Sequence, residues 1–201
     1  MAAADRREQI LAVALDVFAT GGYHETTLDA VAARAGISKA LIYEHFESKR
    51  ELHGALLERY VHELLERVVS AIAELADHED RLRAGVDAFL GFVAERRDAW
   101  RFVFRNFADP EIAVAVARLR EEIAAMIAGL MRADAPAEWV DEPEMVAEIE
   151  MIAQQLTGGF QALANWWDEH RDVPRARVLQ AFMDFAWVGL ERGAAGERWQ
   201  R

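Results

Sequence analysis

The residues with the clearest chemical use are Ser38, Lys39 and Ala40, which open a segment with helical spacing. A lysine can donate hydrogen bonds to guanine O6 and N7 in the major groove of DNA, and small neighbours let a helix come close to the base edges. Ile42 and Phe46 are four residues apart, so both can face inward on one side of that helix. The residues left facing outward are Lys39, Ala40, Tyr43 and Glu44. The pattern favours a DNA-reading helix, and a short helical hairpin inside an all-α core is the alternative.

Start and stop signals predict the turn that would present this helix. Thr27 is a good N-cap for a short helix that ends at Ala35. Gly36 can adopt the positive φ that a tight turn needs, and Ser38 can cap the next helix. Two helices joined by a four-residue turn over 35–38 have the geometry of a helix-turn-helix motif.

The rest of the chain also has helical periodicity, and no stretch shows the alternation of a half-buried strand. A first helix is expected over about residues 5–20, closed by Gly21-Gly22. Ser48 and Glu51 have the spacing of a capping box and predict a long fourth helix. Further helices are expected over about 79–97, 98–107, 110–132, 143–170 and 174–192, with a loop over 132–142. The predicted fold class is all-α.

The charge of the chain is distributed unevenly, which limits where nucleic acid could bind. The 201 residues carry a formal net charge of −12. The first fifty contain six Lys and Arg against seven Asp and Glu, a balance of −1, and the remaining 151 contain 17 against 28, a balance of −11. Because the acidic remainder would repel phosphate, any DNA contact is expected within the first fifty residues.

Other kinds of chemistry are poorly represented. There is no cysteine, which excludes disulfides, thiolate zinc sites and cysteine nucleophiles. None of the six histidines follows a glutamate by three residues, and no phosphate-binding glycine loop or serine-nucleophile motif occurs. We therefore expect no enzyme activity, no metal and no cofactor. With no signal-peptide core and no apolar run of bilayer length, a cytoplasmic location without a membrane partner is also expected.

Three segments together resemble the signature of the tetracycline-repressor (TetR) family: Thr26 to Ser38 (TTLDAVAARAGIS), Ile42 to Phe46 (IYEHF) and Ser48 to Leu52 (SKREL). The close match covers about residues 8–56, and the length and helix layout extend it loosely over the whole chain. The resemblance implies a homodimeric repressor that binds a palindromic double-stranded DNA operator. It further implies that the operator is released when a small-molecule effector enters the C-terminal domain. The alternative is a ligand-independent regulator, or a helical interaction or scaffold protein controlled by a protein partner.

The resemblance also implies a division of roles. A helix-turn-helix DNA-binding domain would cover 1–47, and a helical ligand-sensing and dimerisation domain would cover 48–201. The implied DNA-binding residues are Thr27, Ser38, Lys39, Ala40, Tyr43, His45 and Lys49. Lys39 and Ala40 would face base edges, while the threonine, the tyrosine, the histidine and the second lysine would approach phosphates. Leu41 stands where the family often has threonine or another small residue, so a polar contact is lost there.

Aromatic residues gather in the middle of the chain, where an apolar or aromatic effector could bind. The candidate ligand-binding residues are Phe89, Phe92, Trp100, Arg101, Phe104, Phe107, Met126 and Gln155. Arg97, Arg101 and Arg105 recur every four residues, which would give a pocket a cationic mouth suited to an anionic amphiphile such as a fatty acyl thioester. If these arginines are solvated instead, a neutral or cationic molecule fits the acidic domain better. Ordinary core packing beside a solvated basic stripe is the alternative.

The last two predicted helices carry more apolar residues than one core needs. Over 143–170, apolar residues and one glycine step by four and three, as in a coiled-coil seam. The helix over 174–192 is apolar on nearly every face. We expect a homodimer interface that includes Leu163, Trp166, Phe182 and Phe185. A terminal helix buried within its own chain is the alternative.

Overall fold

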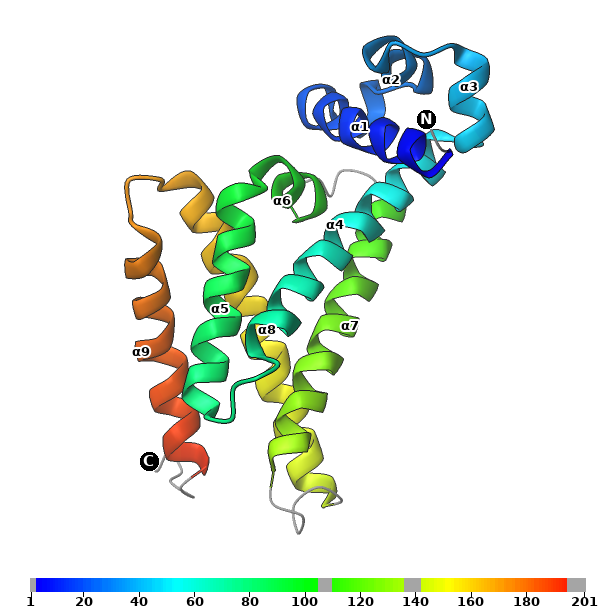
Figure 1. Cartoon of the computed structure of the whole chain (residues 1–201). Coiled ribbons are helices and arrows are strands. Elements are labelled where there is room, and N and C mark those ends of the chain that lie inside the picture. The colour runs from blue at the N-terminus through cyan, green and yellow to red at the C-terminus, as the bar shows by residue number, and fades with distance from the viewer. Residues whose placement is uncertain (1–2, 105–109, 136–141, 195–201) are drawn as a thin grey trace. The chain divides into compact units, whose positions relative to one another are not determined.

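The computed structural model describes residues 3–104, 110–135 and 142–194. Within these ranges every regular element is an α-helix (Figure 1). The chain separates into two compact units, residues 1–109 and 110–201. The predicted all-α class is confirmed, and the functional boundary expected after residue 47 stays a prediction.

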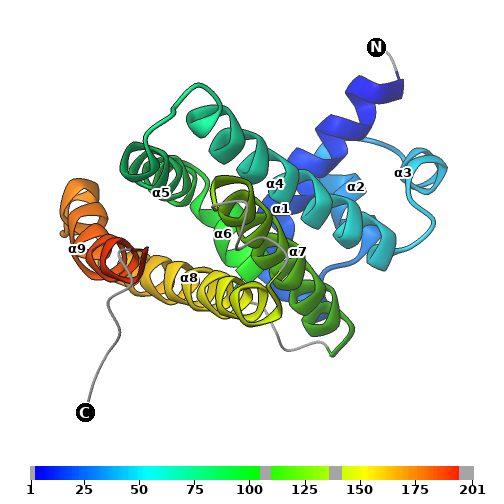
Figure 2. The same cartoon turned by 90° about the horizontal axis from the view of Figure 1, so that it is seen from below.

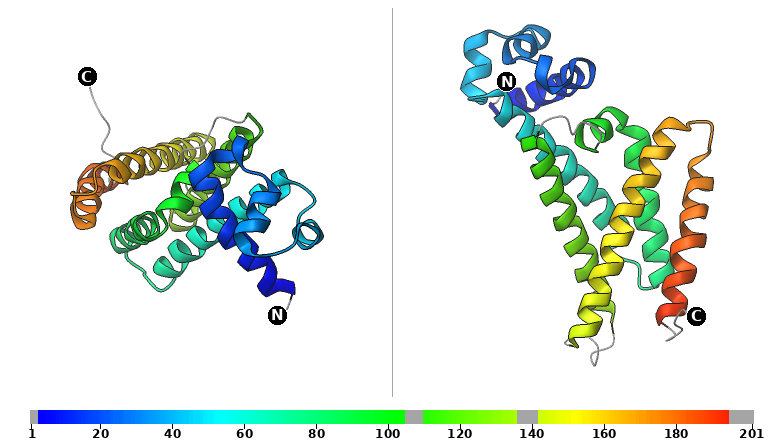
Figure 3. Two further views of the ribbon diagram at one scale, coloured as in Figure 1. Left: turned by 90° about the horizontal axis from the view of Figure 1, so that it is seen from above. Right: turned by 180° about the vertical axis from the view of Figure 1, so that it is seen from behind.

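The first unit begins with a three-helix head, residues 3–45, which consists of α1 (Ala3–Glu25), α2 (Leu28–Ala35) and α3 (Lys39–His45) (Figure 3). Apolar residues at helical spacing on all three helices form its core. The least exposed of them are Ile10, Leu11, Ala14, Phe18, Val31, Ala32 and Ile42. Ile42 and Phe46 are both buried, as their spacing predicts.

A hydroxyl cap begins each of α2 and α3, and a glycine forms the turn between them. Thr27 Oγ1 accepts a hydrogen bond from the Ala30 amide at 3.1 Å. Ser38 Oγ accepts one from the Leu41 amide at 3.2 Å. Gly36 has a φ of 66°, in the left-handed region that favours glycine. The predicted caps and turn are therefore confirmed.

Helix α1 extends further than its sequence pattern predicts. The pattern predicts an end near Thr20, but the helix resumes after a kink and ends at Glu25. The kink lies at Gly22, whose φ of 71° and ψ of 171° are readily adopted only by glycine. The Thr26 hydroxyl donates to the Gly22 carbonyl at 2.7 Å and holds the turn beyond the kink. The predicted stop signal therefore coincides with the kink, and the hydrogen bond from Thr26 to Gly22 holds the extra turn.

Three further helices complete the first unit: α4 (Lys49–Ile72), α5 (His78–Glu95) and α6 (Arg97–Phe104). α4 and α5 lie side by side and run in opposite directions (Figures 1 and 2). Ser48 Oγ accepts a hydrogen bond from the Glu51 amide at 3.1 Å and opens α4, as predicted. The Glu51 carboxylate accepts from the Glu47 amide at 2.7 Å, one residue before the amide that a capping box uses.

An aromatic group joins the head to the rest of the first unit. The His53 ring on α4 lies 5.4 Å from the Phe18 ring on α1 and 4.5 Å from the Phe102 ring on α6, measured between centroids. Tyr23, near the end of α1, lies 5.0 Å from the same ring. His53 is buried, so close packing against both α4 and α6 sets the position of α1.

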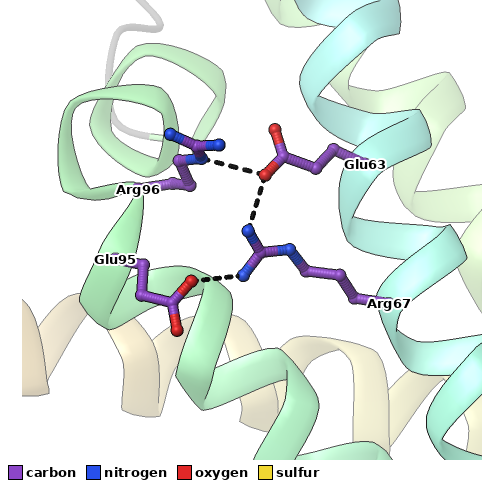
Figure 4. A network of polar contacts seen from close by, with 4 residues as sticks. All are labelled: Glu63, Arg67, Glu95 and Arg96. Carbon is purple, nitrogen blue, oxygen red and sulfur yellow. Dashed lines mark hydrogen bonds and ion pairs between the residues drawn. The ribbon is translucent and has the colours of Figure 1, made fainter.

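A partly buried polar network fixes the junction between α5 and α6 (Figure 4). Glu63 on α4 accepts from Arg67 at 2.8 Å and from Arg96 at 2.9 Å. Arg67 also donates to Glu95 at 2.8 Å. Arg96 is the C-cap of α5, and its amide donates to the Phe92 carbonyl at 2.8 Å. One carboxylate therefore ties α4 to the residue at which the chain turns from α5 into α6.

The second unit consists of α7 (Pro110–Asp134), α8 (Pro143–Glu169) and α9 (Arg175–Ala194). α7 and α8 run in opposite directions and pack around Ala128, Ile149 and Ala153 (Figure 3). The Phe160 ring on α8 stacks on the Phe182 ring on α9, with centroids 4.2 Å apart. The helices predicted after residue 75 are all present, and the predicted end at residue 107 lies outside the described residues.

Side chains also fix the turn between α8 and α9. Trp167 Nε1 donates to the Val173 carbonyl at 2.8 Å across this turn. The buried Asp168 carboxylate accepts from Arg171 at 3.0 Å. Both contacts lie within six residues of sequence, so the turn is locally determined.

Glu63→Gln is expected to lower the free energy of unfolding by about 1 kcal/mol, because it removes the charge shared by two ion pairs in a partly shielded network. Chemical denaturation followed by circular dichroism measures the change. Glu66→Gln is the matched control, since Glu66 lies on the same helix and makes one solvent-exposed pair with His62 at 3.0 Å. Equal effects of the two substitutions would contradict the role given to the network.

Candidate nucleic-acid interface

Helix α3 presents a polar face to solvent. The exposed residues on it are Lys39, Ala40, Tyr43 and Glu44. The opposite side is anchored by Ile42, which is 0% exposed, and Leu41 and His45 are half-buried at the edges. An anchored helix with a small residue in its exposed face can approach the base edges of a major groove closely.

Lys39 is already paired within the head. Its ammonium group forms an ion pair with the Asp29 carboxylate in the first turn of α2. The hydrogen bond to Asp29, together with its negative charge, raises the pKa of Lys39 above the ordinary value, so the lysine is fully charged at neutral pH. Both side chains remain largely in solvent, where a base edge or a phosphate can reach the same ammonium group.

Lys49 has a structural contact that its sequence position did not suggest. Its ammonium group donates to the Tyr23 carbonyl at 2.8 Å and to the His24 carbonyl at 3.1 Å. It also lies 4.5 Å from the centroid of the Tyr23 ring. A positive charge is favourable beside the carbonyls of a helix C-terminus. Lys49 thus holds the start of α4 against the end of α1, and a third ammonium proton could serve a phosphate.

Thr27 caps α2 and also has a hydroxyl proton that is free to face a DNA phosphate. It is exposed at the start of α2, and its oxygen accepts from the Ala30 amide. The hydroxyl proton of the same group can donate to a phosphate oxygen. The first amides of α2 add a partial positive charge that also attracts phosphate.

The predicted ligand-binding residues are brought together only in part. Trp100 packs against Phe89 with ring centroids 5.4 Å apart and against Phe104 at 4.3 Å. Phe92 is buried, and its ring centroid lies 5.7 Å from the Arg67 guanidinium. Arg97 and Arg101 are half-buried, Met126 and Gln155 belong to the second unit, and Phe107 and Arg105 lie outside the described residues. The ligand-binding role stays a prediction.

The predicted dimer residues differ in exposure. Phe185 on α9 is 83% exposed and Trp166 on α8 is 44% exposed. Leu163 is half-buried. Phe182 is buried and stacks on Phe160 of its own chain, so it already has an intrachain partner. The interface assignment stays a prediction, and Phe185 tests it more directly than Phe182.

Helix α8 packs within its own chain along one line of residues and is exposed along a neighbouring line. The first part of the predicted seam, Met145 and Ile149, packs against α7. An adjacent line of residues is exposed and forms what we call the α8 stripe: Met151, Gln155, Gly158, Ala162 and Trp166. A Cβ added at Gly158 would have no described atom within 4 Å. The described part of the chain therefore leaves this stripe uncovered.

One residue of the candidate interface, Asp29, and one structural contact of Lys49 were not predicted from the sequence. Asp29 was read only as part of a family signature, although its place two residues after the Thr27 cap puts it in the first turn of α2. The second is the contact of Lys49 with the end of α1, for which the sequence carries no local signal. Within the described ranges no three His, Asp or Glu residues form a metal-binding group, and no helix is long and apolar enough to cross a membrane.

Comparison with known proteins agrees with this geometry. Residues 10–56 match the family described as bacterial regulatory proteins, tetR family, and residues 78–189 match the tetracyclin repressor-like C-terminal domain. The chain is 33% identical over 189 residues to the HTH-type transcriptional activator FasR of Mycolicibacterium smegmatis, a match that covers 92% of this chain and 83% of FasR.

Solved structures share the fold. A TetR-like transcriptional regulator from Rhodococcus sp. RHA1 superposes with a TM-score of 0.76 at 28% identity, over 98% of this chain and 100% of that one. The transcriptional regulator FadR of Bacillus subtilis, solved in complex with stearoyl-CoA, gives a TM-score of 0.72 at 17% identity, over 86% of this chain and 95% of that one.

The capped turn and the outward face of α3 define a helix-turn-helix DNA-binding regulator of transcription. The chain belongs to the TetR family, since the two matched domains together extend over most of its length.

Lys49→Ala is expected to lower the free energy of unfolding by about 1–2 kcal/mol, because two charge-assisted hydrogen bonds and one cation–π contact are lost. It should also weaken binding to all DNA sequences and reduce the salt dependence by about one unit for each protomer. Thermal unfolding and fluorescence anisotropy with labelled duplexes measure the two effects. Lys39→Ala is the comparison, expected to change sequence preference and to leave thermal unfolding nearly unchanged, because it removes one solvent-exposed ion pair. Equal and salt-independent behaviour of both variants would contradict these roles.

Proposed function

We propose that the protein is a homodimeric repressor that binds a palindromic DNA operator through α3 and leaves it when a small-molecule effector binds. The observation that carries the proposal is the exposed face of Lys39, Ala40 and Tyr43 on an anchored helix. Membership in the TetR family supports DNA binding, and the acidic balance of residues 51–201 favours a contact within the first fifty residues.

Within this proposal a few side chains of the first fifty residues recognise the DNA sequence. Lys39 donates to a guanine edge, and Ala40 allows close approach. Thr27, Tyr43, His45 and Lys49 contact phosphates and fix the orientation of α3. Glu44 stays solvated at the side of the groove.

Two copies of the chain would meet through α8 and α9. The α8 stripe is uncovered among the described residues, and its small residues permit close approach of another helix. On α9, Phe185 and Val188 are 83% and 48% exposed and lie one helical turn apart. Apolar surface of this kind on two long helices suits a helical dimer interface.

The effector we propose is a fatty acyl thioester. The group formed by Phe89, Trp100 and Phe104 offers an apolar wall, and Arg97 and Arg101 lie on the same helix as Trp100. The structure of the similarly folded FadR of Bacillus subtilis was solved with stearoyl-CoA, which supports this chemical class.

Activation of transcription is the second candidate. It is favoured by the relative FasR, which is described as a transcriptional activator. A dimer that binds DNA near a promoter can either activate or repress transcription. In vitro transcription with the selected operator distinguishes activation from repression.

The wild-type protein is expected to select a pseudo-palindromic sequence from random duplexes, with half-site centres about one helical turn or a small multiple apart. Phe185→Glu should produce monomers in sedimentation and weaken operator binding by at least about tenfold, because two half-sites bound together gain effective concentration. Arg192→Glu, on an exposed part of the same helix, is the control and should stay dimeric. A folded wild-type monomer at micromolar concentration, with no preferred sequence, would overturn the proposal.

Stearoyl-CoA is expected to raise the thermal unfolding temperature of the protein and to weaken its operator binding. The physical requirement is a higher affinity for the conformation that does not bind DNA, since equal affinity for both conformations shifts nothing. Thermal shift and anisotropy measured with and without operator test this, with coenzyme A and stearate as separate controls. Stabilisation that leaves operator affinity unchanged would instead favour a regulator that does not respond to ligand.

A further inference from the structure

We infer that Asp29 is a specificity-determining residue. It holds the Lys39 ammonium group, so that the protein binds random DNA weakly and its operator strongly. The inference rests on the proposed role of α3 as the reading helix. It concerns a residue that does not itself contact a base, so Asp29 acts by positioning and neutralising Lys39.

The first support is the place of the pair. Asp29 lies in the first turn of α2 and Lys39 is the first residue of α3, so the ion pair spans the turn of the helix-turn-helix. Lys39 is the one lysine or arginine on α3. The positive charge that this lysine gives to α3 is therefore balanced by the Asp29 carboxylate.

The second support is the exposure of the pair. The side chains of Lys39 and Asp29 keep 71% and 45% of their accessible surface. Ion pairs in solvent are weak, so the ammonium group can be exchanged or shared when a better acceptor arrives. A buried pair would instead hold the lysine away from any DNA.

The third support is the difference between the acceptors. On random DNA the lysine meets phosphate oxygens, and taking Lys39 away would leave the Asp29 carboxylate facing a negative backbone without its partner. At an operator, guanine O6 and N7 carry no formal charge. An ammonium group has three donors, so Lys39 can keep Asp29 while it donates to another acceptor. The Asp29 charge then offsets the attraction of the ammonium group for a charged phosphate, whereas a hydrogen bond to an uncharged guanine depends less on that attraction. The carboxylate thus disfavours the phosphate contact more than the base contact.

Other cations of the first fifty residues also have partners within the chain. Arg34 pairs with Asp16 at 2.7 Å, Arg7 lies 5.0 Å from the Phe46 ring centroid, and Lys49 donates to two carbonyls. Arg34 and Asp16 offer a matched control, because they form an exposed pair on α2 and α1 and do not involve α3.

The experiment uses the full-length dimer, the operator selected by the wild type, and a scrambled duplex of the same composition. Asp29→Asn is expected to tighten binding to the scrambled duplex by about two- to fivefold, the range given by an exposed ion pair. Operator binding should change by less than about twofold, because the base contact survives. The salt dependence on the scrambled duplex should steepen by about 0.9 for each protomer, as one more cation meets phosphate.

Two further variants separate the possible causes. Asp16→Asn removes one negative charge from the head and should leave the ratio of operator to scrambled affinity unchanged. In a Lys39→Ala background, Asp29→Asn should lose its effect on scrambled DNA, because Asp29 acts through the lysine. Asp29→Ser provides a second variant if thermal unfolding shows that Asp29→Asn weakens α2.

The inference is overturned if Asp16→Asn and Asp29→Asn change the ratio equally, since net charge then explains the result. It is also overturned if the effect of Asp29→Asn persists without Lys39, which would mean direct repulsion of phosphate by Asp29. A wild type that selects no sequence at all would remove the proposed function, and this outcome is visible before any Asp29 variant is measured.

Discussion

The burial of one apolar stripe on α1 is the constraint on which the first unit depends. Ile10, Leu11, Ala14 and Phe18 are each at most 1% exposed. Burying side chains of the larger types contributes about 1.5–3 kcal/mol each, far more than any exposed ion pair of the head. α1 packs against α2, α4 and α6, so this single stripe fixes the position of α2, which precedes the turn, and of two later helices of the first unit. The orientation of α3 follows from this packing through Ile42 and Phe46.

α4 is shared between the head and the remainder of the first unit. Its first residue, Lys49, holds the end of α1, and His53 packs between α1 and α6. Further along, Glu63 and Arg67 hold the junction of α5 and α6. These contacts lie near the start and in the second half of one helix. A displacement of α6 would therefore meet resistance from both an aromatic group and a polar network.

Features determined by neighbouring residues could be predicted from the sequence, and those that depend on distant contacts could not. The Thr27 and Ser38 caps and the Gly36 turn involve partners within about three residues, so their signals are local. The extra turn of α1 needs the Thr26 hydroxyl, and the Asp29–Lys39 pair needs the folded turn to bring two helices together. On α8, periodicity identified apolar residues but could not say that Ile149 would pack in its own chain while Trp166 stayed exposed.

The internal pairing of cations in the head has a consequence for how such a regulator is distributed in a cell. Lys39, the one lysine or arginine on α3, carries its own carboxylate partner, and the first fifty residues have a balance of −1. A chromosome offers on the order of a million or more competing sites for every operator, and charge alone drives occupancy of those sites. A head with little uncompensated charge dissociates from them readily. More of its copies then remain free to diffuse, and fewer copies are needed to keep an operator occupied.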